Sequence, residues 1–223
     1  LSRAFGELEV HPIENIRVDG YPELIWLSNR KSDETAPVYH YDGVATVGRI
    51  PWHSDLVYTT TPNRGALLRM LEMPHSGGQT GWIDTAAAYD ALPEDTKQRI
   101  EHLEARFRFI ADPRDMRFGR PNVERHDETN LEREKAFYPK FPDTIHPLVW
   151  KHPVSGRKAL CVSPLHLREA IGVPADEGDA LLHDMVRWDN LRTMHRAFGN
   201  PPDASRLVHR TTLKSTVVMG RLA

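Results

Sequence analysis

Histidine and carboxylate side chains are the residues of this 223-residue chain that are best suited to bind a metal ion. The sequence holds 12 histidines but a single cysteine, Cys161. One cysteine excludes an internal disulfide and any site built from several thiolates. A transition-metal site in this chain must therefore combine imidazole nitrogens with carboxylate oxygens.

The sharpest local pattern is the segment Trp52-His53-Ser54-Asp55. If this segment is a strand, His53 and Asp55 point to the same face, because side chains two positions apart share a face. A second histidine from a distant segment would then complete two histidines and one carboxylate, the facial triad of non-haem iron(II) oxygenases. A histidine close to an aspartate is also a common surface arrangement, so this pattern alone is weak evidence.

A second pattern near the other end of the chain makes the first one specific. Trp188-Asp189-Asn190 is followed by His195, and Arg210 stands fifteen positions after that histidine (210 − 195 = 15). Together with the His-x-Asp pair, this arrangement resembles the taurine dioxygenase family. That family consists of 2-oxoglutarate-dependent iron(II) oxygenases and includes aryloxyalkanoate dioxygenases and alkylsulfatases.

Two further stretches are similar to the same family. Ser-Gly-Gly-Gln-Thr at 76–80 is followed by Ala-Ala-Tyr-Asp-Ala-Leu-Pro at 87–93, and His-Pro-Val-Ser-Gly-Arg-Lys-Ala-Leu occupies 152–160. The resemblance therefore covers about residues 52–210 and rests on four separate motifs in the same order.

The resemblance implies a ligand set and a binding residue for the co-substrate. It makes His53, Asp55 and His195 the iron ligands. It assigns Arg210 to the far carboxylate of 2-oxoglutarate, and a guanidinium group matches a carboxylate with two parallel hydrogen bonds.

Three more roles follow from the resemblance, and each has an ordinary alternative. Thr80 matches a threonine that helps to bind the far carboxylate, although it could be a plain strand residue after a glycine turn. Arg206 matches an arginine near the carboxylate beside the keto group, although it could be a solvated residue at a strand end. Trp188 matches an aromatic residue close to the iron, and it would serve as a core residue in either case.

The substrate is less well defined than the co-substrate. We expect a small organic molecule, such as a sulfonate, a sulfate ester, an aryloxyalkanoate or a similar acid. Arg49 could hold an anionic group, and a surface role is the alternative for it. The candidate pocket residues are Arg49, Leu56, Tyr58 and Cys161.

The implied reaction uses iron(II), 2-oxoglutarate and O₂ to hydroxylate a substrate C–H bond, with release of succinate and CO₂. Two alternatives stay open: a zinc or manganese hydrolase with the same ligands, and a non-catalytic jelly-roll binding protein. Arg210 and Thr80 favour the oxygenase, since hydrolysis does not need a bound 2-oxoacid.

The elements that must position these residues are mostly short strands. Strand-like segments separated by glycine turns surround a helical stretch in the middle of the chain. This pattern predicts a mainly β fold with flanking helices and a double-stranded β-helix, or jelly-roll, core. Strands are expected at 25–28, 45–48, 65–73, 80–83, 147–150, 159–162, 188–197, 206–212 and 216–219, and helices at 84–92, 93–107 and 175–187.

The length predicts one domain over 1–223, with a helical and loop insertion around 84–145. Residues 112–141 are charged and read as a lid, because loops of this length are usually functional or disordered. The helix expected at 175–187 runs almost directly into Trp188, where the family has a further strand. Either the chain has a true deletion at this junction, or residues are missing there. We expect the second, with residues missing before Leu1 as well, so that 223 residues are a subset of a longer chain.

Composition restricts the partners. The chain has 29 Lys and Arg against 31 Asp and Glu, a net charge of −2, which argues against a nucleic-acid surface. No apolar stretch is long enough to span a bilayer, and no secretory signal is present. A cytoplasmic enzyme with a small-molecule substrate is expected, and assembly into a homo-oligomer stays open.

Overall fold

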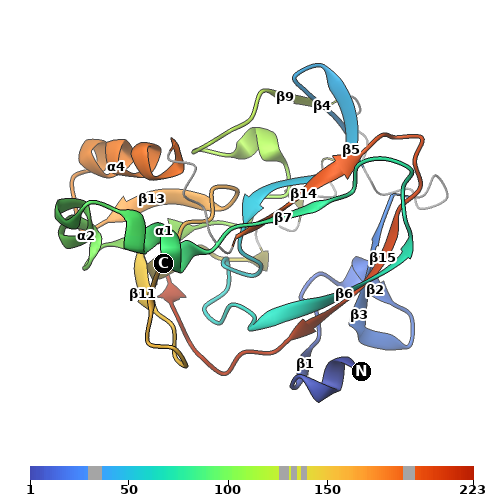
Figure 1. The fold of residues 1–223 in the computed structure, drawn as a ribbon, viewed down its shortest axis with the longest axis horizontal. Coiled ribbons are helices and arrows are strands. Elements are labelled where there is room, and N and C mark those ends of the chain that lie inside the picture. Colours follow the sequence, from blue (N-terminus) through green and yellow to red (C-terminus); the bar gives the residue numbers. More distant parts are fainter. Residues whose placement is uncertain (30–36, 126–130, 132–134, 137–139, 188–193) are drawn as a thin grey trace.

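The computed structural model describes residues 1–29, 37–125, 131, 135–136, 140–187 and 194–223. This part of the chain is mainly β, with antiparallel sheets and helices α1, α2 and α4 gathered on one side (Figure 1). Within it, no helix is long and apolar enough to cross a membrane.

The first sheet carries the His-x-Asp motif. Its strand order is β7 (Thr80–Trp82), β14 (His195–Asn200), β5 (Val44–His53), β4 (Val38–Tyr41) and β9 (Val123–Arg125). β14 therefore lies between β5 and β7, so that a segment from late in the sequence joins two early ones (Figure 1).

The second sheet carries Arg210. Its strands are β1 (Leu8–Glu9), β15 (Leu207–Leu213), β3 (Tyr21–Ser28) and β2 (Arg17–Val18), and β6 (Gly65–Glu72) pairs with β15 as well. Along β15 the residues Val208, Arg210 and Thr212 are buried, while His209 and Thr211 are less so. This alternation follows the two-residue period of a strand and directs Arg210 inward.

The third sheet and the helices enclose the main hydrophobic core. The sheet order is β13 (Leu167–Ile171), β8 (Glu104–Phe107), β10 (Thr144–Pro147) and β16 (Arg221–Leu222), and β11 (Val149–Lys151) pairs with β12 (Lys158–Leu160). The helices are α1 (Thr85–Ala91), α2 (Glu94–Ile100) and α4 (Ala175–Arg187). Short 3₁₀ turns occupy Ser2–Ala4, Glu14–Ile16 and Pro113–Asp115. The side chains of Phe107, Leu148, Leu167 and Leu182 in this core are fully buried.

Most of the predicted elements are confirmed in type. α1 begins where the sequence indicates, because the Asp84 carboxylate accepts hydrogen bonds from the backbone N–H groups of Ala86 and Ala87. α4 has the predicted bounds. The strands expected at 25–28, 45–48, 65–73 and 80–83 correspond to β3, β5, β6 and β7.

Two predicted elements are wrong. The helix expected over 93–107 ends at Ile100, and Glu104–Phe107 forms the strand β8. Ala105 and Phe107 are both completely buried two positions apart, so pairing with β10 and β13 outweighs the helical spacing of the apolar residues. The expected strand at 216–219 is irregular in the structure.

The start of the predicted lid is packed into the fold. Asp112 is 1% exposed, its carboxylate pairs with Arg114 at 2.7 Å, and it lies 3.8 Å from the buried Arg125. Arg125 ends β9, which extends the first sheet beyond β4. The positions 126–130, 132–134 and 137–139 lie outside the described residues, so a lid role for the rest of 112–141 stays a prediction.

Candidate metal centre

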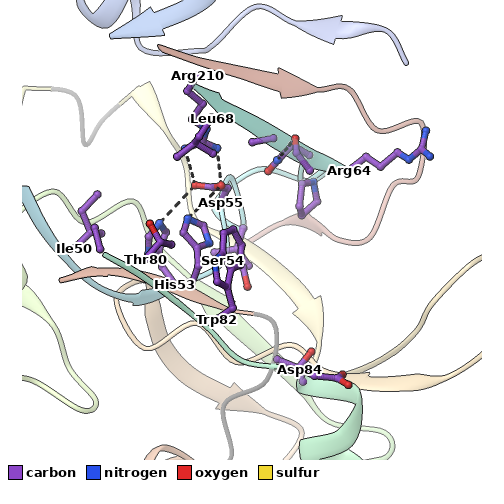
Figure 2. Close-up of a pocket in the computed structure, with 18 of the residues that line it drawn as sticks. Ile50, His53, Ser54, Asp55, Arg64, Leu68, Thr80, Trp82, Asp84 and Arg210 are labelled. Atoms are coloured by element: carbon purple, nitrogen blue, oxygen red, sulfur yellow. Dashed lines mark hydrogen bonds and ion pairs between the residues drawn. The ribbon is translucent and has the colours of Figure 1, made fainter. Parts of the chain in front are cut away.

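His53 and His195 face each other across two paired strands. They are direct partners in the register of β5 and β14, and the centres of their imidazole rings are 4.2 Å apart. His53 is buried at 6% exposure, whereas His195 is half-buried beside a cavity. Strand pairing therefore brings together two histidines that are far apart in the sequence. His53 is labelled in Figure 2.

Asp55 reaches the same point by a different route from the one predicted. The strand β5 ends at His53, so the expectation that His53 and Asp55 share one strand face is wrong. Asp55 lies in a turn in which Leu56 adopts a left-handed φ of +54° and the Leu56 carbonyl accepts a hydrogen bond from the Thr59 N–H at 2.8 Å. Leu56 is 2% exposed, so burial of its side chain offsets the backbone strain that aims Asp55 at the histidines.

The three side chains converge with their ligand atoms on one side. The His53 Nε2 atom lies 3.5 Å from Asp55 Oδ1, and the His195 Nε2 atom lies 3.6 Å from Asp55 Oδ2. All three ligand atoms lie within 4.8 Å of one another. Ligands about 2 Å from a common ion are roughly 3 Å apart when adjacent, so a small shift would close this group around a metal.

The protonation states of the three groups suit a cation. His53 Nδ1 lies 2.8 Å from the Pro51 carbonyl, which only accepts hydrogen bonds, so Nδ1 carries a proton and the ring is held with Nε2 toward Asp55. Burial and the neighbouring His53 lower the pKa of His195 to about 4. Burial alone would raise the pKa of Asp55, but His53 and Arg210 outweigh it and hold this pKa well below its ordinary value. Two imidazoles and one carboxylate therefore form a donor set that fits a transition metal.

Arg210 pairs with the carboxylate of this group. Its Nη1 atom donates to Asp55 Oδ1 at 3.1 Å, and its Nη2 atom donates to Asp55 Oδ2 at 2.5 Å (Figure 2). Both side chains are largely buried, at 10% and 18% exposure. The sequence places Arg210 with a co-substrate carboxylate, and the structure shows it bound to a carboxylate of the chain itself.

Thr80 and Arg206 line a cavity of about 780 Å³ beside the centre. The Arg206 Nε atom is buried and lacks a hydrogen-bond partner, and burial lowers the pKa of this guanidinium. A partly desolvated cation at a cavity wall favours an anionic ligand. Much of the remaining wall is apolar, including Leu27, Ile50, Leu68, Trp82, Trp150 and Met219.

Of the predicted pocket residues, the structure brings only Cys161 to this cavity. Burial raises the pKa of its thiol to about 12, so Cys161 serves as a small apolar wall residue. The Arg49 guanidinium stacks 4.0 Å from the centre of the Tyr41 ring, while its neighbours Gly48 and Ile50 line the cavity.

Leu56 and Tyr58 also lie away from the cavity. They pack with Phe109 in a separate small core, while Val57 between them lines the cavity. The left-handed turn at Leu56 is the reason, since it ends the strand alternation on which the prediction depended.

Trp82 lines the cavity but was not predicted as a site residue. Its ring stacks on His195, with ring centres 5.2 Å apart and planes 26° apart, and it is 66% exposed. Its distance of two positions from Thr80 on a predicted strand could have indicated a shared face. The predicted aromatic neighbour Trp188, with Asp189 and Asn190, lies outside the described residues.

The family model for the taurine catabolism dioxygenase TauD, TfdA family matches residues 1–187. The chain belongs to this family. The predicted resemblance is therefore confirmed. His195 and Arg210 lie beyond the matched range, so their proximity to Asp55 is evidence from the structure.

Several relatives of this TauD/TfdA chain are named for the reaction that they catalyse. An alkylsulfatase of Acinetobacter baylyi is 28% identical over 209 residues, which cover 85% of this chain and 64% of that protein. A 2-oxoglutarate-dependent sulfate ester dioxygenase of Pseudomonas putida is 29% identical, with 98% and 72% covered. A 2-oxoglutarate-dependent 2,4-dichlorophenoxyacetate dioxygenase of a Burkholderia species is 30% identical, with 95% and 75% covered. The chain thus spans about two thirds to three quarters of the length of these relatives.

Solved structures agree with this membership. A taurine dioxygenase from Burkholderia xenovorans is similar with a TM-score of 0.66 and 26% identity, over 97% of this chain and 70% of the other. A second protein from that organism, described as a putative taurine dioxygenase, has a TM-score of 0.69 at 23% identity and covers 100% and 77%. The second likeness concerns the fold alone.

Proposed function

We propose that this chain is an iron(II)- and 2-oxoglutarate-dependent dioxygenase that hydroxylates a small organic substrate. The observation that supports this proposal best is the convergence of His53, Asp55 and His195 at the edge of a cavity whose wall includes Arg206 and Arg210. The TauD/TfdA relatives act, by their names, on sulfate esters and aryloxyalkanoates. We propose substrates of the same class for this chain, together with sulfonates and similar acids. Succinate and CO₂ would be the co-products.

Each residue has a defined part in this proposal. His53, Asp55 and His195 hold the iron, which together with 2-oxoglutarate and O₂ supplies the oxidising chemistry. Arg206 and Arg210 bind the two carboxylates of 2-oxoglutarate, because buried guanidinium groups need anionic partners.

The remaining cavity wall orients the substrate and excludes water. Thr80 offers a hydroxyl group beside the dicarboxylate, and it is placed next to Ala197 by the pairing of β7 with β14. The apolar wall near Trp82 and Trp150 suits the hydrocarbon part of a substrate. An apolar wall also keeps water away from reactive species.

The fold supports the same reading. We propose that the two sheets that carry His53 and Arg210 are the halves of a jelly roll, with 1–223 as a single domain. The structural likeness to taurine dioxygenases supports this architecture.

A metal-dependent hydrolase could use the same three ligands. Arg206 and Arg210 at the cavity favour the oxygenase, because a hydrolase does not need to bind a dicarboxylic co-substrate. A binding protein that had lost its metal would not need the convergence of His53, Asp55 and His195.

The test is turnover of 2-oxoglutarate. The protein is incubated with iron(II), ascorbate, O₂ and 2-oxoglutarate, and succinate is measured with and without alkyl sulfates, sulfonates and aryloxyalkanoates. We expect substrate-stimulated succinate that requires iron and disappears in His195→Ala. Ester cleavage with zinc, in the absence of 2-oxoglutarate, would replace this proposal by the hydrolase.

A further inference from the structure

The Asp55–Arg210 ion pair joins two residues to which the proposed function gives different partners. Asp55 is needed by the metal, and Arg210 is needed by the dicarboxylate. In the structure both terminal nitrogens of Arg210 are engaged by the two oxygens of Asp55 (Figure 2). A metal on Asp55 and a dicarboxylate on Arg210 would therefore each bind to a group that already contacts the other.

Arg210 has no second partner of opposite charge within the described part of the chain, whereas Asp55 also has His53 and His195 beside it. Within the described part of the chain, the ion pair and the side-chain hydrogen bonds of Arg210 all go to Asp55. The Arg210 Nε atom is buried and unpaired. A largely buried guanidinium that loses its counter-charge is costly, as is a buried carboxylate that loses its cation.

We propose that the metal ion and the dicarboxylate replace the two halves of this pair, and that their binding is therefore positively coupled. The proposal rests on the proposed function of the site. A divalent cation that binds Asp55 draws the carboxylate charge away from Arg210 and leaves a buried cation that attracts the dicarboxylate. A dicarboxylate on Arg210 in turn frees Asp55 for the metal, and such coupling is equal in both directions.

Two simpler views predict different behaviour for the metal alone. If Arg210 only binds the co-substrate, its removal leaves metal affinity unchanged. If Arg210 mainly holds Asp55 in position, its removal weakens metal binding. Under the proposal Arg210 competes for Asp55, so its removal strengthens metal binding.

The experiment measures Mn²⁺ affinity by isothermal titration calorimetry, without any 2-oxoacid, for the wild type and for Arg210→Gln. We expect the variant to bind Mn²⁺ about 5-fold tighter or more, which is the lower end of usual coupling free energies. The matched control is Arg206→Gln, which removes the same charge from the same cavity wall without contact with Asp55. We expect this control to change the affinity less than twofold.

A second measurement uses the wild type and therefore does not depend on the fold of a variant. Glutarate has the length of 2-oxoglutarate but lacks the keto oxygen, so it cannot form the keto-carboxylate chelate. We expect glutarate to bind tighter by about 5-fold or more in the presence of saturating Mn²⁺. Without metal, Asp55→Asn should bind glutarate tighter than the wild type, because Arg210 is released from its ion pair.

The outcomes separate this inference from the proposed function. Mn²⁺ binding that is lost in His195→Ala, but unchanged or weakened in Arg210→Gln, overturns the coupling and leaves the metal site intact. Equal glutarate affinity with and without Mn²⁺ overturns it as well. If the wild type binds no Mn²⁺ and His195→Ala makes no difference, the proposed function and the coupling both fail.

Discussion

At the scale of single residues, the position of one proton separates a metal ligand from an ordinary buried histidine. His53 Nδ1 donates to the Pro51 carbonyl, which leaves Nε2 free toward Asp55. His209 is a useful contrast, because it stands beside Arg210 on β15 but packs against the Trp26 ring at 4.4 Å on the other face of the sheet. Residue type alone does not tell these two histidines apart.

This contrast gives the first prediction. We expect His195→Ala to weaken Mn²⁺ binding at least about 100-fold, because one of three protein ligands is lost. We expect His209→Ala to change it less than twofold, since that ring faces away from the centre. Calorimetric titration of both variants checks this, and similar losses in the two would contradict the assignment of His195.

A second prediction concerns His11, which is 7% exposed. Burial, and then the charge of Arg210, lower the pKa of His11 to about 4. In the unfolded chain its pKa is about 6.5, so between these values only the unfolded chain binds the proton. The free energy of unfolding should therefore fall as the pH drops from 6.5 toward 4, by up to about 1.4 kcal/mol per pH unit from this residue.

His11→Asn is the variant that tests this. An asparagine side chain can still accept the Ile13 N–H, which lies 3.2 Å from His11 Nδ1, but it does not titrate. Urea unfolding at pH 7, 6 and 5 should show a shallower pH dependence in the variant and little difference above pH 6.5. An identical slope in both proteins would rule out a role for His11 in acid destabilisation.

Part of the centre could be predicted from the sequence at this scale. The His-x-Asp spacing and the fifteen residues between His195 and Arg210 are enough to nominate the ligands. The ion pair between Asp55 and Arg210 could not be predicted. The motif assigns Asp55 to the metal and Arg210 to the co-substrate, and it does not indicate that the two side chains contact each other. The position of Arg49 also depends on a strand face that the pattern leaves open.

At the scale of elements, the centre depends on the close pairing of β14 with β5. Gly199 in β14 has a φ of +74°, and a Cβ atom there would meet Thr46 Cγ2 and lie 2.6 Å from the Val47 carbonyl oxygen in β5. A side chain at this position would push apart the two strands that carry the histidines. The approach of these strands is therefore set by a glycine four residues after His195.

The third prediction follows from this contact. Gly199→Ala should lower the free energy of unfolding by about 3 kcal/mol or more, because overpacking adds to the strain of a left-handed alanine. The control is Gly43→Ala in the turn between β4 and β5, which has a φ of +80° but no atom within 4 Å of the added Cβ. It should cost about 1 kcal/mol, and chemical denaturation of both variants decides whether the strand contact matters.

Elements are also where the sequence misleads most. The spacing of Ile100, Leu103 and Phe107 is helical, but the chain leaves α2 after Ile100 and forms β8. Its neighbours β10 and β13 are distant in the sequence. The residues next to β8 in the sequence therefore do not reveal the strand pairing that makes this segment a strand. The turn at Leu56 is similar, because its cost is offset by burial against Phe109.

At the scale of the whole molecule, the centre is built from residues of two sheets. His53 and His195 belong to the first sheet, and Arg210 belongs to the second. The cavity between them is bounded by residues from both ends of the described chain, such as Leu27 and Met219. A ligand that binds there restrains both sheets at once.

The fourth prediction is therefore a large effect of ligands on thermal stability. Mn²⁺ together with 2-oxoglutarate at about 100 times the dissociation constant should stabilise the fold by about 2.7 kcal/mol. For a chain of this length that corresponds to a rise in Tm of about 5–10 °C. Scanning fluorimetry should show this rise in the wild type, little with Mg²⁺, and none in His195→Ala. A rise that persists in His195→Ala would mean that the ions act elsewhere.

The distance in sequence between the ligands has a consequence for how the protein acquires its metal. His53 and His195 are 142 positions apart (195 − 53 = 142). At about 5–20 residues per second, a ribosome needs roughly 7 to 30 seconds to add the second histidine after the first. During that interval this centre has only two of its three protein ligands, His53 and Asp55. The centre can therefore be completed only after His195 has been added and β14 has paired with β5.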